Sequence, residues 1–338
     1  MGAVTQKPPR RHHVVNRAYL ARFARDGMLK RVPLVGKPHL ISMNNATVER
    51  DFYSTTAPGL EVDAYETTLS QIEGRAEEAF RRVVDEGVWP TPEDRVAIAQ
   101  WIAAQFLRTR AIRRTTEDIQ RSTNKLEVGT STPDQIRERM GLPDATDEEI
   151  EDLRARMLAT VDTYEVDPQM HLSLMAESME GFINLTLSRP WAIVRWKRRA
   201  LATSDTPVVL VGDPDSPIPG VGFGSAGHVM VPLSRRVGLT LGSVGNRENY
   251  PEGEVPGTTR SARLFNESTI GNARQVLFHH PDDDPLTGFT LPEPRTTEMN
   301  TSDSQIEKLI EAFAQQQGRP SGLPPRPTGA EADTDAQE

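Results

Sequence analysis

The sequence predicts an α+β protein in which helices come before a small, mostly antiparallel sheet along the chain. Two observations support this prediction. Residues 63–188 contain segments whose apolar side chains recur at the period of a helix. Residues 190–245 contain short β-branched runs separated by Gly, Pro, Asp and Ser, a pattern typical of strands and turns.

Composition divides the chain into an arm, a domain and a tail. We expect residues 1–11 to form a flexible arm and residues 12–280 to form a single α+β domain. Residues 281–338 are rich in Pro, Gly and acidic side chains, so we expect them to be largely disordered, with one helix at 304–317.

Two long helices are predicted in the first half of the domain. The first covers about residues 63–87, where apolar side chains share one face and Gly87 suits a helix end. The second covers about residues 92–125, because Thr91 can cap its N-terminus and Pro92 follows at the first helical position. The first half of this helix is apolar on nearly every side, so we expect it to be central and buried.

Shorter elements surround these helices. Residues 28–43 are expected to form a small hairpin around Gly36. Residues 131–161 are expected to form a charged helical pair, an excursion from the body of the fold. A further amphipathic helix is expected at 167–188, before the sheet, and a late helix at 261–278, after it.

The composition excludes several classes of protein. The chain has no cysteine, so disulfides, thiolate zinc sites and cysteine nucleophiles are excluded. It also has no run of about 18 apolar residues and no secretory signal, so we expect a cytoplasmic protein without a membrane span. The sequence identifies neither a cofactor nor a metal, and it does not define an oligomeric state.

Charge is distributed unevenly along the chain. The formal net charge is −9, but residues 1–50 hold ten Lys or Arg against two acidic residues, which leaves −17 for the rest. A basic N-terminal segment is suited to nucleic acid, to a phosphorylated small molecule, or to the acidic remainder of the same protein.

Seven short motifs follow one another along the chain: "HHVVNRAYLARFA", "RDFYS", "LSQIE", "WIAAQFLRTRAIR", "ATSDTPVV", "VMVPLS" and "FNESTIGNARQVLF". In this order they resemble a bacterial and phage family catalogued as domain of unknown function 4238. The resemblance covers residues 12–280, and the main departure is Asn16, where the family usually has Pro. It implies a shared fold and implies no activity, although a role in phage defence or host takeover fits the family's distribution.

Three residues are candidates for catalysis. His12 or His13 can act as a general base because imidazole titrates near neutral pH. Asp205 lies in a loop between two predicted strands, where it can orient a histidine or bind a metal. The alternatives are structural histidines and a turn in which the Asp205 side chain bonds to the nearby backbone.

Four residues are candidates for binding an anion. Arg108 and Arg113 continue apolar faces of the second long helix, so each needs an acidic partner or an anionic ligand if it is buried. One interpretation is an ion pair with Glu73 or Glu66 on the preceding helix, and the other is a phosphate or carboxylate pocket. Tyr53 and Ser204 complete the set in the second interpretation.

These residues support two functional hypotheses. The first is a hydrolase, such as a nuclease, that acts on nucleic acid or a phosphorylated small molecule. The second is a non-catalytic interaction or regulatory protein in which the same side chains form a structural polar network. In an enzyme these side chains must converge on one site that solvent and substrate can reach. In a structural network they can be buried away from solvent.

Overall fold

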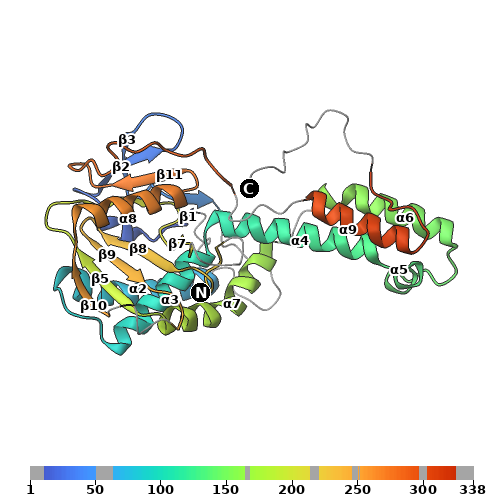
Figure 1. Ribbon diagram of the computed structural model, residues 1–338, viewed down its shortest axis with the longest axis horizontal. Helices are drawn as coiled ribbons and strands as arrows, with labels where there is room; N and C mark the ends of the chain where they lie inside the picture. Colours follow the sequence, from blue (N-terminus) through green and yellow to red (C-terminus); the bar gives the residue numbers. More distant parts are fainter. Residues whose placement is uncertain are drawn as a thin grey trace, which may run out of the picture. The chain divides into compact units, whose positions relative to one another are not determined.

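The computed structural model describes residues 11–50, 64–163, 168–213, 221–245, 250, 252–296 and 303–324, and it confirms a mixed α+β fold (Figure 1). The chain divides into two compact units. Unit 1 contains residues 1–114 and 168–298, and unit 2 contains residues 115–167 and 299–338. Residues 115–167, which fall within the range predicted as one domain, therefore group with the C-terminal part of the chain.

Unit 1 is built around a buried helix, as the sequence predicts. Thr91 caps this helix, accepting a hydrogen bond from the Asp94 backbone N–H at 3.2 Å while the Asp94 carboxylate accepts one from the Thr91 N–H at 3.1 Å. Ile98 and Trp101 are fully buried. The helices of unit 1 are α1 (Arg17–Ala21), α2 (Ala64–Phe80) with a following π-helical turn (Arg81–Asp85), α3 (Pro92–Leu107), the start of α4 (Arg110–Thr130), α7 (Pro168–Ser188) and α8 (Thr259–Asn272).

The predicted single helix over 92–125 is wrong, because the chain forms α3 and α4 with a break between them. Arg108 has φ −85° and ψ 3°, outside the helical region, and its backbone N–H closes α3. The Thr109 hydroxyl then accepts a hydrogen bond from the Ile112 backbone N–H at 3.3 Å, as an N-cap does. The residues that share one face of α4 therefore do not continue the faces of α3.

The predicted late helix over 261–278 is also wrong at its C-terminal end. The helix α8 ends at Asn272, and Ala273 has the extended backbone angles φ −58° and ψ 141°. Residues 276–279 form a strand instead, because they pair with neighbouring strands on both sides. Side-chain apolarity in this stretch was equally compatible with a helix or a strand.

The strands of unit 1 form three sheets. Five strands lie in the order β10-β5-β9-β8-β7, in which only β10 and β5 pair in parallel, and the predicted hairpin is present as β2 and β3 in the order β3-β2-β11-β6. The prediction of a single sheet over residues 190–245 is therefore wrong, because β6 pairs with β11 and so belongs to the same sheet as the hairpin. The strands are β1 (Arg11–His13), β2 (Met28–Pro33), β3 (His39–Ser42), β4 (Val48–Arg50), β5 (Trp191–Arg195), β6 (Thr203–Ser204), β7 (Val209–Val211), β8 (His228–Ser234), β9 (Val237–Leu241), β10 (Gly253–Pro256) and β11 (Val276–His279), with β1 paired to β4.

The late helix α8 packs closely on the five-stranded sheet. Phe265 of α8 is buried, and its ring would lie 2.6 Å from a Cβ atom added to Gly238 of β9. Only glycine permits this approach of a helix side chain to the strand backbone. The Phe265 ring also meets the Trp196 ring edge-on, with centroids 5.5 Å apart. These contacts hold the middle of α8 against the sheet of unit 1.

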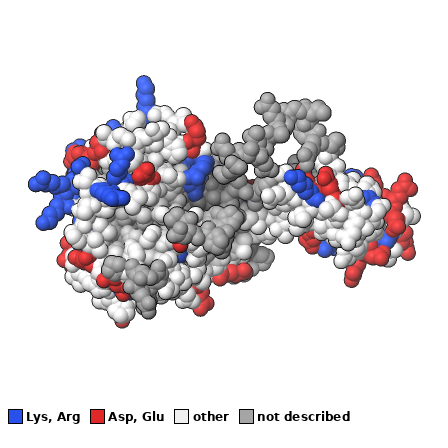
Figure 2. All heavy atoms as spheres, in the orientation of Figure 1, with Lys and Arg blue, Asp and Glu red and all other residues white. Residues whose placement is uncertain are grey.

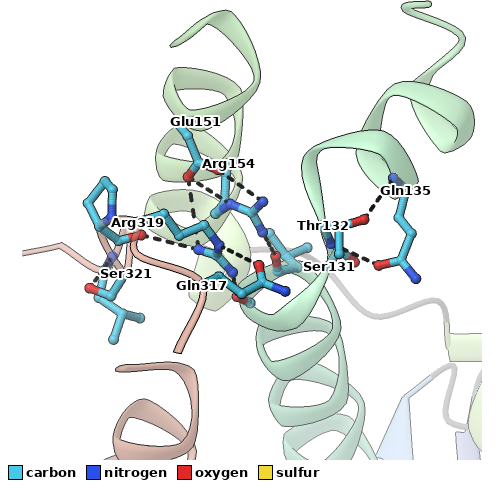
Figure 3. Close-up of polar contacts among 12 residues, drawn as sticks. Ser131, Thr132, Gln135, Glu151, Arg154, Gln317, Arg319 and Ser321 are labelled. Carbon is cyan, nitrogen blue, oxygen red and sulfur yellow. Dashed lines mark hydrogen bonds and ion pairs between the residues drawn. The ribbon is translucent and has the colours of Figure 1, made fainter. Parts of the chain in front are cut away.

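The regular elements of unit 2, in the residues that the structure describes, are helices. Within it, Arg154 is fully buried and donates to the Val128 carbonyl at 2.7 Å and to Glu151 at 3.0 Å (Figure 3). The segment after the last helix is held in place as well, since Arg319 donates to the Gly129 carbonyl at 2.6 Å. The helices are residues 115–130 of α4, α5 (Pro133–Met140), α6 (Asp147–Thr160) with a 3-10 turn (Val161–Thr163), and α9 (Asp303–Gln316), which agrees with the helices predicted at 131–141, 146–161 and 304–317.

Part of the predicted tail follows an irregular but packed course. Leu286, Phe289 and Leu291 pack against a small apolar cluster that includes Ile270 of α8. The backbone N–H of Arg295 donates to the Arg274 carbonyl at 2.9 Å. Residues 281–296 thus belong to the folded body of unit 1. The predicted arm up to residue 10 and the end of the tail from residue 325 lie outside the described residues.

Candidate functional site

A pocket of about 540 Å³ in unit 1 is the strongest candidate site. It lies where the ends of β1, β4 and the β2–β3 hairpin meet the start of α4 and the backbone that joins α8 to β11. Its volume falls in the range of about 300 to 1,000 Å³ that is common for small-molecule sites. Aliphatic parts of its wall come from Val14, Val15, Ile41, Ala111 and Val276.

The charged residues of this pocket are mostly cationic. Five arginines line it, with His39, against the two carboxylates of Glu49 and Asp205. The lining therefore carries a formal charge of +3 with a neutral histidine, in a chain whose net charge is −9. A concave surface with this charge attracts anions. The arginines are Arg31, Arg110, Arg114, Arg274 and Arg295.

The arginines differ in how they are held. Arg110 donates to the Glu49 carboxylate at 2.6 Å, so these two charges neutralise each other. Arg274 is buried, and its side chain donates to the Asn272 carbonyl at 2.7 Å. Arg31 and Arg114 have no hydrogen-bond or ion-pair partner among the described residues, which makes them the two cations best placed to bind a ligand.

Asp205 lies at this pocket in a rigid setting. One carboxylate oxygen accepts a hydrogen bond from the Arg274 backbone N–H at 3.0 Å and the other accepts one from the Gln275 N–H at 2.9 Å. Burial raises the pKa of Asp205, and these backbone hydrogen bonds oppose that shift. The carboxylate therefore ties the turn after β6 to the start of β11 while it also lines the pocket.

Ser204, beside Asp205, is sealed from solvent. Its hydroxyl accepts a hydrogen bond from the Thr206 backbone N–H at 3.1 Å. Thr206 in turn donates from its hydroxyl to the Asn272 carbonyl at 2.8 Å, and the Asn272 amide donates back to the Thr206 carbonyl at 2.9 Å. These contacts give Ser204 a structural setting, and Ser204 does not line the pocket.

The two N-terminal histidines lie on β1. His12 is 4% exposed, and its Nε2 atom is 3.4 Å from a carboxylate oxygen of Glu66 on α2. His13 is half-buried. Neither histidine lines the pocket, although the next residues, Val14 and Val15, do. The structure therefore does not bring His12 and His13 together with Asp205 around one cavity.

Arg108 belongs to a closed network. It is 2% exposed and donates to Glu73 of α2 at 2.5 Å and to the side-chain oxygen of Gln105. The Gln105 amide donates to the Val14 carbonyl at 3.0 Å, and its oxygen accepts from the Asn16 N–H at 3.3 Å. The ion pair with Glu73 is the one that the sequence offered as the structural alternative.

The remaining sequence-predicted binding residues are placed elsewhere. Arg113 is half-buried and does not line the pocket. It lies near His171, a buried histidine whose pKa falls to about 4 because of burial and, secondarily, the Arg113 charge. Tyr53 lies outside the described residues.

Sequence reasoning missed most of the pocket arginines. Arg110 and Arg114 belong to the cluster at the end of the second predicted helix, but the helix break after Leu107 changed which members share a face. Their spacing of four residues, which places both on one side of a helix that starts at residue 110, was the available signal. Arg31, Arg274 and Arg295 are far apart in the sequence, and only the sheet β3-β2-β11-β6 brings them to one cavity.

The described ranges contain neither a cluster of metal ligands nor a helix that could span a membrane. No three His, Asp or Glu side chains there are grouped as a metal ion would require. None of the helices in those ranges is both long enough and apolar enough to span a lipid bilayer. Unit 2 has a second hollow, of about 630 Å³, in which Arg139 is already paired with Glu127 at 2.8 Å.

The fold and the pocket together define an α+β protein with an arginine-lined site suited to anions. A family model described as "Protein of unknown function (DUF4238)" matches residues 11–283. The chain therefore belongs to this family, as the seven motifs indicated. All lining residues of the pocket except Arg295 and Thr296 fall within the matched range. No curated protein and no solved structure matches the chain.

Proposed function

We propose that the pocket of unit 1 binds a ligand through its phosphate group, either a phosphorylated small molecule or a nucleic acid with an accessible phosphate. The observation that carries this proposal is the pair of cations without a partner among the described residues, Arg31 and Arg114, in a pocket of net positive charge. A guanidinium group matches the geometry of phosphate with two parallel hydrogen bonds. A phosphate group also carries roughly −1.5 to −2 charges near pH 7, which suits the +3 lining.

Isothermal titration calorimetry tests this binding, with pyrophosphate, ADP, ATP and a 5′-phosphorylated decanucleotide as separate ligands. The double variant Arg31→Gln/Arg114→Gln should bind at least about tenfold more weakly, because each charged hydrogen bond contributes roughly 1.5–3 kcal/mol. The comparison among the four ligands separates the two sources of phosphate. Arg75→Gln is the matched control, since this exposed arginine on α2 does not line the pocket. Equal affinity of the parent and the double variant for every ligand would contradict the proposal.

A finer proposal is that the site hydrolyses a phosphate ester, with Asp205 as the group that exchanges a proton. It is supported by the position of Asp205 in the pocket wall and by the burial that raises its pKa, which favours a carboxyl that can hold a proton. Release of nitrophenol from bis(4-nitrophenyl) phosphate tests it. Asp205→Asn should abolish turnover while pyrophosphate binding persists, and unchanged turnover would remove Asp205 from the mechanism.

The non-catalytic alternative is supported by a different set of residues. His12 with Glu66, Arg108 with Glu73 and Gln105, and Ser204 with Thr206 are buried pairs of the kind a structural network requires. In this alternative the pocket senses a phosphorylated ligand without altering it. Ligand binding without any turnover of the bound ester would favour it over the hydrolase.

A further inference from the structure

A second cationic surface of unit 1 lies away from the pocket. We call it the basic patch and define it by six residues from three segments: the loop after β5, the turn between β8 and β9, and the first turns of α8. Five of them are exposed and Arg236 is half-buried, and blue side chains gather on this part of unit 1 at the left of Figure 2. The residues are Lys197, Arg198, Arg199, Arg236, Arg260 and Arg263.

Direct contacts make the three segments one surface. The Trp196 backbone N–H donates to the Arg236 carbonyl at 3.0 Å, and the Arg236 side chain donates to the Lys197 carbonyl. The Arg199 side chain donates to the Thr259 hydroxyl at 3.3 Å, next to Arg260. The Trp196 ring N–H donates to the Thr258 carbonyl at 3.0 Å. The cations of the patch are therefore held side by side by the fold.

The basic patch and the pocket lie at opposite ends of α8. Arg260 and Arg263 are in its first two turns, whereas Arg274 of the pocket lies two residues beyond its last residue, Asn272. A helix of 14 residues is about 20 Å long, so the two sites are separated by roughly that distance. None of the six patch residues lines the pocket.

The cations of the patch form no ion pairs with acidic residues of the described chain, although the Asp283 carboxylate, which is paired with Arg235, also lies near Arg236. The adjacent Arg195 is paired with Glu254. The next charged residue along α8 is Glu267, one turn beyond Arg263. Charged side chains on a folded surface are usually interspersed with opposite charges, so an unpaired group of six is suited to a polyanion.

The division of charge between the units strengthens this argument. Unit 2 holds 21 acidic residues and nine Lys or Arg, which gives it a formal charge of −12. Because the whole chain has a formal charge of −9, unit 1 has a formal charge of +3. The net negative charge of the whole chain argues against nucleic-acid binding only when it is averaged over both units. That net negative charge belongs to unit 2. The unit that carries the patch is cationic.

We propose that the basic patch binds the phosphate backbone of a nucleic acid duplex without reading its sequence. Five of its six cations are arginines, and each guanidinium group can donate two parallel hydrogen bonds to one phosphate. The rings of Trp196 and Phe265 beneath the patch are buried, and the Arg263 guanidinium covers the half-buried Phe289 ring at 4.7 Å from its centroid, so these rings are poorly placed to stack on the bases of a single strand. A duplex offers phosphates without requiring base contacts.

The same observations disfavour a membrane as the occupant. Outside the six cations of the patch, the rest of unit 1 carries a formal charge of −3, so a flat anionic bilayer that extends beyond the patch meets no further net positive charge on this unit. Stable attachment to a membrane usually also needs apolar side chains that insert, and of the three patch segments, as the structure describes them, only α8 presents an exposed large apolar residue, Leu264. A duplex is narrow enough to touch the patch alone.

Fluorescence anisotropy with a labelled 20-base-pair DNA duplex, titrated at KCl concentrations from 50 to 200 mM, tests the proposal. If all six cations meet phosphates, the logarithm of the binding constant falls with a slope of about −5 against the logarithm of salt concentration. Arg198→Glu/Arg260→Glu should weaken binding at least tenfold and reduce the slope by about 2. The control Arg75→Glu/Arg156→Glu changes net charge equally at exposed arginines outside the patch and should bind as the parent does.

The outcomes separate this proposal from that for the pocket. Arg31→Gln/Arg114→Gln should keep duplex affinity, and Arg198→Glu/Arg260→Glu should keep affinity for pyrophosphate, so either proposal can fail alone. Absence of duplex binding, or equal duplex affinity of the patch variant and its control, overturns the basic-patch proposal. So does binding to phosphatidylserine vesicles without duplex binding. If the patch variant changes the sedimenting mass of the free protein while no duplex binds, the patch is instead a contact between copies of the chain.

Discussion

Arg108 and Arg114 show how the surroundings of an arginine decide its role. Both belong to the same sequence cluster, only six positions apart. Arg108 is buried and its guanidinium is occupied by Glu73 and Gln105, whereas Arg114 is exposed at the pocket. A buried arginine must keep its partners, because an unpaired charge in the interior is costly. An exposed arginine can exchange water for a ligand.

Removal of the Glu73 carboxylate should therefore destabilise the fold. We expect Glu73→Ala to lower the free energy of unfolding by about 2 to 3 kcal/mol, less than the roughly 3–5 kcal/mol for a fully buried pair, because Glu73 is 26% exposed. Urea unfolding followed by circular dichroism measures this. Glu78→Ala on the exposed face of the same helix is the control and should change the free energy by less than about 0.5 kcal/mol. Equal effects of the two substitutions would show that Arg108 does not depend on Glu73.

His171 should make stability depend on pH. Its pKa is lowered from 6.5 to about 4 in the folded chain, chiefly by burial, so the unfolded chain binds a proton there that the folded chain does not. The free energy of unfolding should fall as the pH is lowered through this window, by up to about 3 kcal/mol, and this contribution should level off below pH 4. Burial also lowers the pKa of His228, His279 and His280, which adds to the slope in the same direction.

Urea titrations from pH 7 to pH 4 on the parent and His171→Gln isolate this contribution. The variant should show a shallower decline of the free energy of unfolding, whatever its stability at pH 7. Parallel curves for the two proteins would mean that His171 is protonated as easily in the folded chain as in the unfolded one.

At the scale of elements, a side chain of α9 packs directly against the backbone of one glycine of α4 in unit 2. A Cβ atom on Gly129 of α4 would lie 2.5 Å from the Ile310 side chain of α9. We expect Gly129→Ala to destabilise unit 2 by about 1 to 3 kcal/mol, because overpacking forces side chains or helices apart. Thermal unfolding followed by circular dichroism measures the effect.

Gly74 provides the matched control for this substitution. It lies within α2, and an added Cβ there would meet no atom within 4 Å. Gly74→Ala should therefore stabilise the protein by roughly 0.5–1 kcal/mol through helix propensity alone. If Gly129→Ala were stabilising to the same extent, the close contact with Ile310 would not constrain the helix pair.

At the scale of the whole molecule, unit 2 is assembled from two distant parts of the chain. Its α9 comes from residues 303–316, and it supplies Ile310 and Ala314, both nearly fully buried, to helices encoded between residues 115 and 163. Lys125 of α4 is buried and donates to Glu307 of α9 at 3.1 Å. Without α9 these helices lose part of their apolar cover, and the buried Lys125 ammonium group loses its ion pair with Glu307.

A chain that ends at residue 298 should therefore lose unit 2 and keep unit 1. We expect its helical circular-dichroism signal to fall by clearly more than the share of the 14 residues of α9, while pyrophosphate binding at the pocket is retained. A chain that ends at residue 324 is the control and should match the parent. A loss of signal limited to the share of α9 would mean that the remaining helices of unit 2 do not need it.

The sequence by itself determined the α+β class, the start of the buried helix at Pro92 and the family. These features depend on local rules: Thr91 and Pro92 define a helix start, and side-chain period separates helices from strands over long segments. The structural alternative for Arg108 was also available, because a buried arginine near acidic residues of a neighbouring helix has few other partners.

Only the tertiary structure decided the break between α3 and α4, the strand at residues 276–279, the pocket and the basic patch. At the break, Arg108 is held by Glu73 of α2, and the strand exists because β2 and β6 offer hydrogen bonds on either side. Arg31, Arg114 and Arg274 share a cavity only because a sheet and a helix bring them together. Such contacts are non-local, and the pattern of neighbouring residues does not encode the distance between positions far apart in the chain.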